Sequence, residues 1–410
     1  MSSVTYPNYP RDGRTTLVVL LLGNAVVHAT TFLARPVVSY RVLALGGDET
    51  TVGVVVATGA ILPVFAAVPM GRLCDRGRVP AIVLGGLALL LGSALGMSQI
   101  ESLLWLAMVN TVYGVGQLAV MLGGQALVTG MSAPGRRDRN FGWFTAAASL
   151  GQMAGPLAAG WAMSLAGPGE LLLATGYAFY VAVAVTALAS VMFGGLLFVL
   201  RGSEAVAPSG RAGEKSGRGS ALRMLTDRQL AVAMLVSGSV IAAVDLLTAY
   251  LPVLGTRYGL SPGFVGVLLS VRAGASFLSR IFIGVLVVRF GRLTVVLLST
   301  GLAACGMAAL ITVGGALMLV LLMVLLGMTL GLGQPLTMTW VVQQAPKRLR
   351  ATALALRVSG NRVAQSVVPA VAGALSAVAG VAAPFALAAG LLALAAGCVV
   401  PFVRMRPRQP

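Results

Sequence analysis

The chain has 410 residues, of which 58% are hydrophobic and 10% are charged. This composition excludes a large soluble domain and indicates a membrane protein. The net charge of +18 does not indicate a nucleic-acid partner. Of the 29 lysines and arginines, 22 lie in segments predicted on one side of the membrane, two (Arg41 and Arg257) on the other, and five within spans. This asymmetry follows the positive-inside rule, so it reports orientation, with both termini predicted to be cytoplasmic.

The residues give no support for catalytic or cofactor chemistry. The three cysteines, Cys74, Cys305 and Cys398, have neither paired nor metal-ligand spacing. A glycine-rich lysine loop for phosphates is missing from the sequence, so direct use of ATP is not expected. We therefore predict that the protein is not an enzyme and holds neither a cofactor nor a metal.

The first half of the chain predicts a cytoplasmic tail, residues 1–14, followed by a six-helix bundle, residues 15–200. Its apolar runs, such as Thr51 to Met70 and Val79 to Met97, are too long and too uncharged for soluble core helices. The first run begins near Thr15 and is longer than the core of a secretory signal, so it is predicted to be a retained span.

The second half repeats this plan. Residues 201–228 are rich in Gly, Ser and Pro and predict a flexible cytoplasmic linker. A second six-helix bundle is expected over residues 229–403, and residues 404–410 form a cytoplasmic tail. The predicted fold class is an all-α membrane protein with 12 transmembrane helices in two pseudo-symmetric bundles.

Three motifs recur in the same order in both halves and indicate an internal duplication. The charged hairpin Gly71 to Arg78, between two apolar runs, matches Gly284 to Arg292 at an offset of 213. The other two matches have offsets of 217 and 213. They pair Gly114-x-Gly116-Gln117 with Gly331-x-Gly333-Gln334, and Gln152-x-x-x-Pro156-x-x-x-Gly160 with Gln365-x-x-x-Pro369-x-x-x-Gly373.

The hairpin string Gly-x-Leu-x-Asp-Arg-Gly-Arg resembles the loop between helices 2 and 3 of the major facilitator superfamily of secondary transporters. It is one residue shorter than the usual form. The string Gly151-x-x-x-Gly155-Pro156-x-x-x-Gly160 resembles the antiporter signature of that superfamily, which is associated with export. Small-residue helix packing alone would also produce it. Asn110 stands where drug-proton antiporters commonly have an arginine, which leaves proton coupling open.

Ionisable groups inside spans usually mark a pathway, because the hydrocarbon core penalises them. Asp245 is the only one of eleven acids predicted inside a span, and His28 is the only histidine. In the resembled family helices 1, 4, 7 and 10 line the cavity. The candidates for the substrate or proton pathway are Asn24, His28, Asn110, Gln117, Asp245, Arg272, Gln334, Trp340, Asn361 and Arg362.

Each candidate also has a structural interpretation. His28 could be a neutral imidazole bonded inside the bundle, and Asp245 could form a static pair with an arginine. Arg272 and Arg362 are predicted near the midplane, where their forks would suit an anionic substrate. Arg280 and Arg357 are shallower, and we expect them to tie helix ends to carbonyls or headgroups.

The hairpin is predicted to act as a conformational latch. Asp75 would pair with a neighbouring arginine and face the N-terminus of helix 11, where the helix dipole favours negative charge. Alternatively, the loop charges only fix the topology. The latch residues are Gly71, Arg72, Asp75, Arg76, Gly77 and Arg78, and the helix-packing residues are Gly151, Gly155, Pro156 and Gly160.

The first functional hypothesis is therefore proton-coupled efflux of an amphipathic drug or metabolite by alternating access. A carrier of a small organic anion is the alternative, and a non-transporting membrane sensor or scaffold is a third. The expected partners are a small molecule, protons and the lipid bilayer, without nucleic acid. A monomer in the bacterial cytoplasmic membrane is expected.

Overall fold

The computed structural model describes residues 13–132, 136–167, 169–200, 227–312, 315–346 and 349–404. The predicted linker, except Asp227 and Arg228, and most of both predicted tails lie outside these residues. In the described part of the chain every regular element is a helix. The all-α prediction is thus confirmed.

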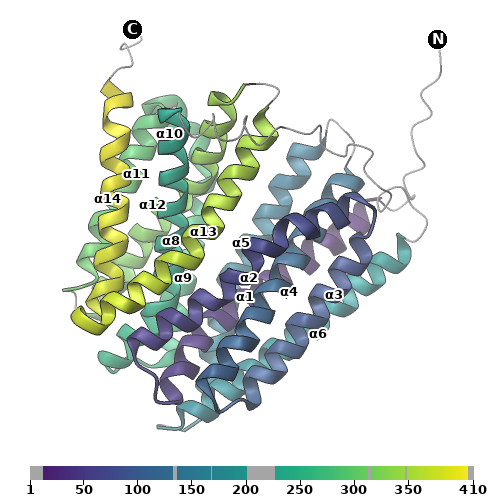
Figure 1. Ribbon diagram of the computed structural model, residues 1–410, viewed down its shortest axis with the longest axis vertical. Helices are drawn as coiled ribbons and strands as arrows, with labels where there is room; N and C mark the ends of the chain where they lie inside the picture. Colours follow the sequence, from purple (N-terminus) through teal and green to yellow (C-terminus); the bar gives the residue numbers. More distant parts are fainter. Residues whose placement is uncertain are drawn as a thin grey trace.

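The helices form two groups, α1–α6 and α8–α14, which Figure 1 shows side by side. The helices of the first group are α1 (Gly13–Ala44), α2 (Glu49–Asp75), α3 (Val79–Gln99), α4 (Leu103–Met131), α5 (Arg137–Met163) and α6 (Leu171–Val199). Those of the second are α8 (Arg228–Arg257), α9 (Pro262–Ile281), α10 (Ile283–Phe290), α11 (Arg292–Ala309), α12 (Ala316–Gln344), α13 (Arg350–Ala379) and α14 (Ala382–Arg404).

Eleven of the described helices are long and apolar enough to cross a membrane. Helix α5 is not among them, but it is 27 residues long and packs along α1 and α9. It therefore takes the place of the remaining predicted span. Helix α10 is short and continues the direction of α9 after a break at Phe282.

The hairpin prediction needs a correction at its start. Helix α2 runs to Asp75, so the residues from Gly71 to Asp75 are helical and only the three from Arg76 to Arg78 connect α2 to α3. Nothing before Gly77 breaks the helix, and the backbone N–H of Arg76 still donates to the carbonyl of Arg72 at 3.1 Å. Gly77 ends it with a φ of 79°, a left-handed conformation that favours glycine.

The repeat predicted from the sequence is visible in the packing. Gly77 and Gly291, which the repeat pairs, have φ angles of 79° and 76°. A Cβ on Gly114 would collide with the backbone of Gly59, and a Cβ on Gly331 would lie 2.7 Å from Cα of Ser276. Gly59 and Ser276 are separated by the same offset as Gly114 and Gly331. The contact of α2 with α4 is therefore reproduced by that of α9 with α12.

Two helix crossings join the halves, and they too are related by the repeat. Gly53 of α2 meets α13, where an added Cβ would lie 2.5 Å from Cα of Gly373. Gly266 of α9 meets Pro156 and Gly160 of α5 in the same way. Both crossings lie near the ends of these helices that are remote from Arg76–Arg78. We call the side with Arg76–Arg78 the basic side and the other the crossing side.

Arg41 fixes the crossing side of the first half. Its side chain is 3% exposed and donates to the carbonyls of Ser98, Ile100 and Leu172, and to the Thr175 hydroxyl. These bonds tie α1 to the α3–α4 connection and to α6. Because a buried guanidinium is costly unless its donors are satisfied, this clamp accounts for the burial of Arg41.

Candidate functional site

An ion pair joins the two halves at the centre of the molecule. Arg35 Nη1 of α1 lies 2.5 Å from Asp245 Oδ1 of α8, and the two side chains are 26% and 11% exposed. It is the one ion pair among the described residues. The Arg35 guanidinium also lies over the Phe32 ring, 5.1 Å from its centroid. The predicted acid therefore has its partner in the opposite half of the chain.

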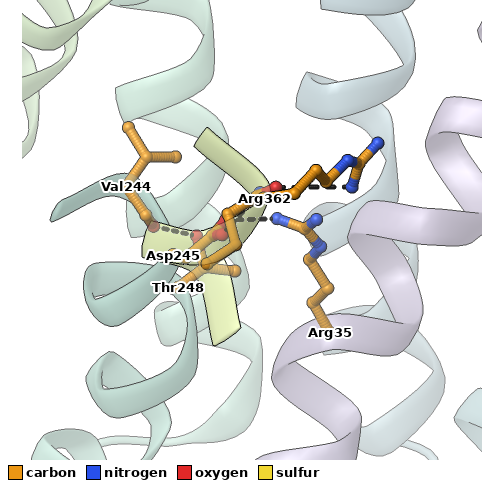
Figure 2. A network of polar contacts seen from close by, with 6 residues as sticks. Arg35, Val244, Asp245, Thr248 and Arg362 are labelled. Carbon is orange, nitrogen blue, oxygen red and sulfur yellow. Dashed lines mark hydrogen bonds and ion pairs between the residues drawn. The ribbon is translucent and has the colours of Figure 1, made fainter. Parts of the chain in front are cut away.

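Gln365 extends this pair to a second arginine, Arg362. Figure 2 shows Arg35, Asp245 and Arg362 in this network. Gln365 Nε2 donates to Asp245 Oδ2 at 2.7 Å, and its Oε1 accepts from Arg362 Nη1 at 3.3 Å. Arg362 Nη2 also contacts Met121 Sδ of α4 at 3.7 Å. One chain of polar contacts thus runs from α1 through α8 and α13 to α4, crossing between the halves twice.

This network of polar contacts borders a cavity that we call the central cavity, which is lined by Arg35, Asp245, Arg362 and Gln365. Its walls come from α1, α2, α4, α8 and α13. The volume that the centres of water molecules can occupy inside it is about 70 Å³. That is space for several waters beside the ion pair. The polar residues that line the cavity are Arg35, Asn110, Tyr113, Gln117, Asp245, Thr248, Arg362 and Gln365.

Asn110, in the position where an arginine was expected from the resemblance, belongs to this wall. It is 8% exposed, and its Nδ2 donates to the carbonyl of Val55 at 2.8 Å. This bond ties α4 to α2. Its side chain therefore contributes an amide to the cavity but no positive charge.

Positive charge exceeds negative charge around Asp245. Arg272 is 3% exposed, does not line the central cavity, and interacts electrostatically with Asp245, Arg35 and Arg280. Its Nε has no hydrogen-bond partner among the described residues. Arg362 likewise interacts with Arg35 and Asp245. One carboxylate therefore faces several guanidinium groups, which leaves the centre of the molecule electropositive.

A second polar network lies within the C-terminal half. Arg357 Nη2 donates to Gln334 Oε1 at 2.5 Å and to the Gln334 carbonyl at 3.0 Å. Asn361 accepts from Ser237 at 2.9 Å and donates to Gln334 at 3.3 Å. This network joins α8, α12 and α13, and neither Gln334 nor Asn361 lines the central cavity.

Three other candidates also lie outside the cavity lining. Asn24 Nδ2 donates to the carbonyl of Phe144 at 2.9 Å and so joins α1 to α5. His28 Nδ1 bonds the carbonyl of Asn24 at 2.9 Å. Trp340 is 2% exposed and packs edge-on against Phe402 of α14 with the ring centroids 6.5 Å apart.

The latch residues lie at the basic side. Asp75 is exposed, and no ion pair connects it to a described residue. Arg72, Arg76 and Arg78 are exposed as well. The first residues of α13 have side chains that are not described, so the predicted contact there stays a prediction.

The four residues of the helix-packing motif divide between two neighbours of α5. A Cβ on Gly151 or Gly155 would meet the backbone of α1, at Ala29 N for Gly151 and at Leu33 N for Gly155, both at 2.8 Å. Pro156 and Gly160 instead meet α9 at the crossing described above. Helix α5 is therefore packed closely on both sides.

Four polar residues of the cavity lining, Arg35, Tyr113, Thr248 and Gln365, were not among the sequence candidates. Arg35 is one of the five arginines predicted within spans, and Gln365 belongs to the third repeated motif. A signal for Arg35 existed, because a cation stabilises an ionised acid within a span and Arg35 is one of the five span arginines. Nothing in the sequence selects Arg35 over the other four.

Two overlapping stretches of the chain, residues 20–264 and 241–410, match the family model of the Major Facilitator Superfamily. A search of the curated proteins gives no match. A bacterial homolog of the human lysosomal transporter Spinster, in an inward-facing and unoccupied conformation, is similar with a TM-score of 0.77 and 14% identity over 96% of this chain and 98% of that chain.

Two further solved structures have the same fold. The nucleoside transporter NupG is similar with a TM-score of 0.76 and 13% identity, covering 97% of this chain and 100% of that chain. A POT family transporter in complex with a thioalcohol-conjugated peptide has a TM-score of 0.74 and 15% identity, covering 95% of each chain.

Proposed function

The chain belongs to the major facilitator superfamily and is a secondary transporter rather than an enzyme, and we propose that it carries a small organic anion through the central cavity. The observation that carries this proposal is the charge imbalance around Asp245. Arg35 and Arg362 line the cavity with a single carboxylate between them. Arginine forks bind carboxylates and phosphates in two-pronged fashion, so an anion gains more here than a cation does.

The ion pair supports a specific coupling to protons. Protonation of Asp245 weakens its attraction for Arg35, and the freed guanidinium then offers its donors to a substrate anion. Proton and anion therefore assist each other's binding, which is symport. A cation would instead compete with the proton for Asp245, which is antiport. The direction of coupling therefore depends on the substrate. An anion takes the place of Asp245 beside Arg35 and gives symport, whereas a cation takes the place of Arg35 beside Asp245 and gives antiport.

The position of the pair supports a role in alternating access. Arg35 belongs to one half and Asp245 to the other, so substrate or proton binding changes a contact that holds the halves together. The glycine crossings bring the halves into contact on the crossing side. We propose that the basic side is the open, cytoplasmic side of a monomeric transporter in a bacterial inner membrane, which agrees with the inward-facing Spinster homolog.

The test is transport by the purified protein in proteoliposomes. A panel of carboxylates, phosphate esters and lipophilic cations is offered with and without a pH gradient. We expect anion accumulation that follows the proton gradient. Arg35→Gln or Arg362→Gln should weaken it by about 10-fold to 100-fold, because each removes a charge-assisted hydrogen bond of about 1.5–3 kcal/mol. Arg289→Gln, on the exposed surface of α10, is the matched control.

A second candidate is proton-linked efflux of an amphipathic cation. The observation that favours it is the close packing of Pro156 and Gly160 of the antiporter-like string at the crossing of α5 with α9. Gradient-driven movement of lipophilic cations, abolished by Asp245→Asn and unaffected by Arg362→Gln, would establish this function and contradict the anion carrier.

A further inference from the structure

A crevice opens between α5 and α9 on the basic side of the molecule. It encloses about 620 Å³ and is separate from the central cavity. Arg139, Trp143 and Ser149 of α5 and Phe277, Arg280 and Ile281 of α9 line it. No acidic residue is among the described residues of its lining. Its walls are thus apolar with two arginines.

The crevice lies at the edge of the membrane-facing surface of α5. Trp143 and Trp161 are 59% and 61% exposed. Their spacing in the sequence is a whole number of turns at about 3.6 residues per turn, so they lie on one face. Leu150 and Leu157, 49% and 44% exposed, continue the same stripe between them. An exposed apolar stripe along a membrane helix contacts lipid, so lipid reaches Trp143 and the crevice beside it.

The two arginines stand at different depths. Arg139 is exposed in the first turn of α5, near the membrane surface. Arg280 is tied at the level of Ser149, where its Nη1 donates to the Ser149 hydroxyl at 2.7 Å and its Nε to the Gly331 carbonyl at 3.4 Å. The level of Ser149 is about 15 Å below that of Arg139 at 1.5 Å per residue. Positive charge therefore lies both at the mouth of the crevice and deeper along its apolar walls.

We propose that this crevice binds an anionic phospholipid, with the headgroup phosphate near Arg139 at the mouth and an acyl chain against Trp143, Phe277 and Ile281. Basic pockets between membrane helices are suited to anionic headgroups, and each arginine near the surface adds about fivefold in affinity. A free anion would satisfy the arginines but leave the apolar walls uncovered. The charge and the apolar surface together select a lipid.

The site would also act on the conformation of the protein. At the crossing side the same two helices are closely packed through Gly160 and Gly266, and Ser270 donates to the Met153 carbonyl at 2.8 Å. The crevice thus exists where α5 and α9 diverge toward the basic side. A lipid between them stabilises this conformation. This inference is independent of the proposed substrate.

Tryptophan fluorescence tests the site directly. Two variants are reconstituted in nanodiscs. One carries Trp105→Phe and Trp161→Phe and reports from Trp143, and the other carries Trp105→Phe and Trp143→Phe and reports from Trp161. Trp340 is buried and gives the same background in both. Nitroxide-labelled phosphatidylglycerol or phosphatidylcholine is added at equal mole fractions.

We expect phosphatidylglycerol to quench Trp143 at about fivefold lower mole fraction than phosphatidylcholine, with no such difference at Trp161. Arg139→Gln should remove most of the difference, whereas Arg404→Gln, an exposed arginine on the same side, should not. If Arg139→Gln does not insert into the membrane, the difference in quenching between Trp143 and Trp161 still tests the proposal. Equal quenching of Trp143 by both lipids, or displacement of the labelled lipid by soluble phosphate, would overturn the proposal.

Discussion

The two halves of this protein keep the same packing but not the same chemistry. Gly53 and Gly266, which the repeat pairs, both lie at a crossing between the halves. By contrast, His28 and Asp245, which stand at near-equivalent positions of the repeat, differ in kind. His28 bonds its own helix, whereas Asp245 pairs with Arg35 across the cavity. Duplication therefore supplied the packing twice, and the ion pair of the site arose from residues that the halves do not share.

The largest expected effect tests the shared frame. Gly53→Val and Gly266→Val each place a branched side chain against the backbone of the opposite half, and overpacking of this kind costs at least about 1–3 kcal/mol. We expect both to abolish transport, to a similar extent. Gly85→Ala and Gly92→Ala, where an added Cβ meets nothing within 4 Å, are the controls. Normal transport by either crossing variant would contradict the equivalence of the two crossings.

The next effect tests the chemical difference. Asp245→Asn leaves Arg35 without its counter-charge, and removing one partner of a buried pair costs about 3–5 kcal/mol, less for Arg35 because it is 26% exposed. We expect proton-dependent transport to be lost. His28→Gln, the change at the equivalent position, should reduce transport less than twofold. Initial rates in proteoliposomes measure both, and equal losses would mean that the halves share the proton-linked chemistry.

Gln365 and Gln152 test the same chemical difference between the halves, with a smaller expected effect. Gln365→Leu removes hydrogen bonds to Asp245 and Arg362, each worth about 1.5–3 kcal/mol because the partner is charged. Apparent substrate affinity should fall by about 10-fold or more. Gln152→Leu, its repeat partner, should leave the affinity unchanged. The ratio of KM values from concentration series decides, and a matching loss in Gln152→Leu would remove Gln365 from its special role.

The smallest effect concerns the caps of α2 and α9. Asp48 accepts from the Thr51 N–H at 2.8 Å, and Ser261, which the repeat pairs with Asp48, accepts from the Phe264 N–H at 3.2 Å. Hydrogen bonds from Thr51 lower the pKa of the Asp48 carboxyl. Its cap therefore stabilises fully above the ordinary aspartate pKa of about 3.9 and is lost as the pH falls through the lowered value.

Replacement of each capping residue by alanine separates the effect of Asp48 protonation from the effect of the cap itself. Asp48→Ala and Ser261→Ala should each cost about 1 kcal/mol at neutral pH. Only the cost of Asp48→Ala should shrink below about pH 4, since serine does not titrate. Thermal unfolding in detergent at several pH values measures the difference. A cost for Asp48→Ala that is constant down to pH 3 would show that its charge has no part in the cap.

The sequence by itself determined the membrane class, the all-helical fold and the duplication. Long apolar runs can span a bilayer only as helices, because every backbone polar group must be satisfied within the segment. The repeated motifs even contain one glycine of each crossing, Gly160 and Gly373. It also identified Asp245 as the lone acid within a span, since acids there are rare enough to stand out.

Only the tertiary structure decided which polar residues meet. The partner of Asp245 lies in the other half of the chain, and Gln334, Asn361 and Trp340 turn away from the cavity. In water, an apolar stripe marks the buried face of a helix. Membrane helices are apolar on the lipid side as well, so their sequence does not reveal how each helix is rotated, and that rotation places Arg35 opposite Asp245.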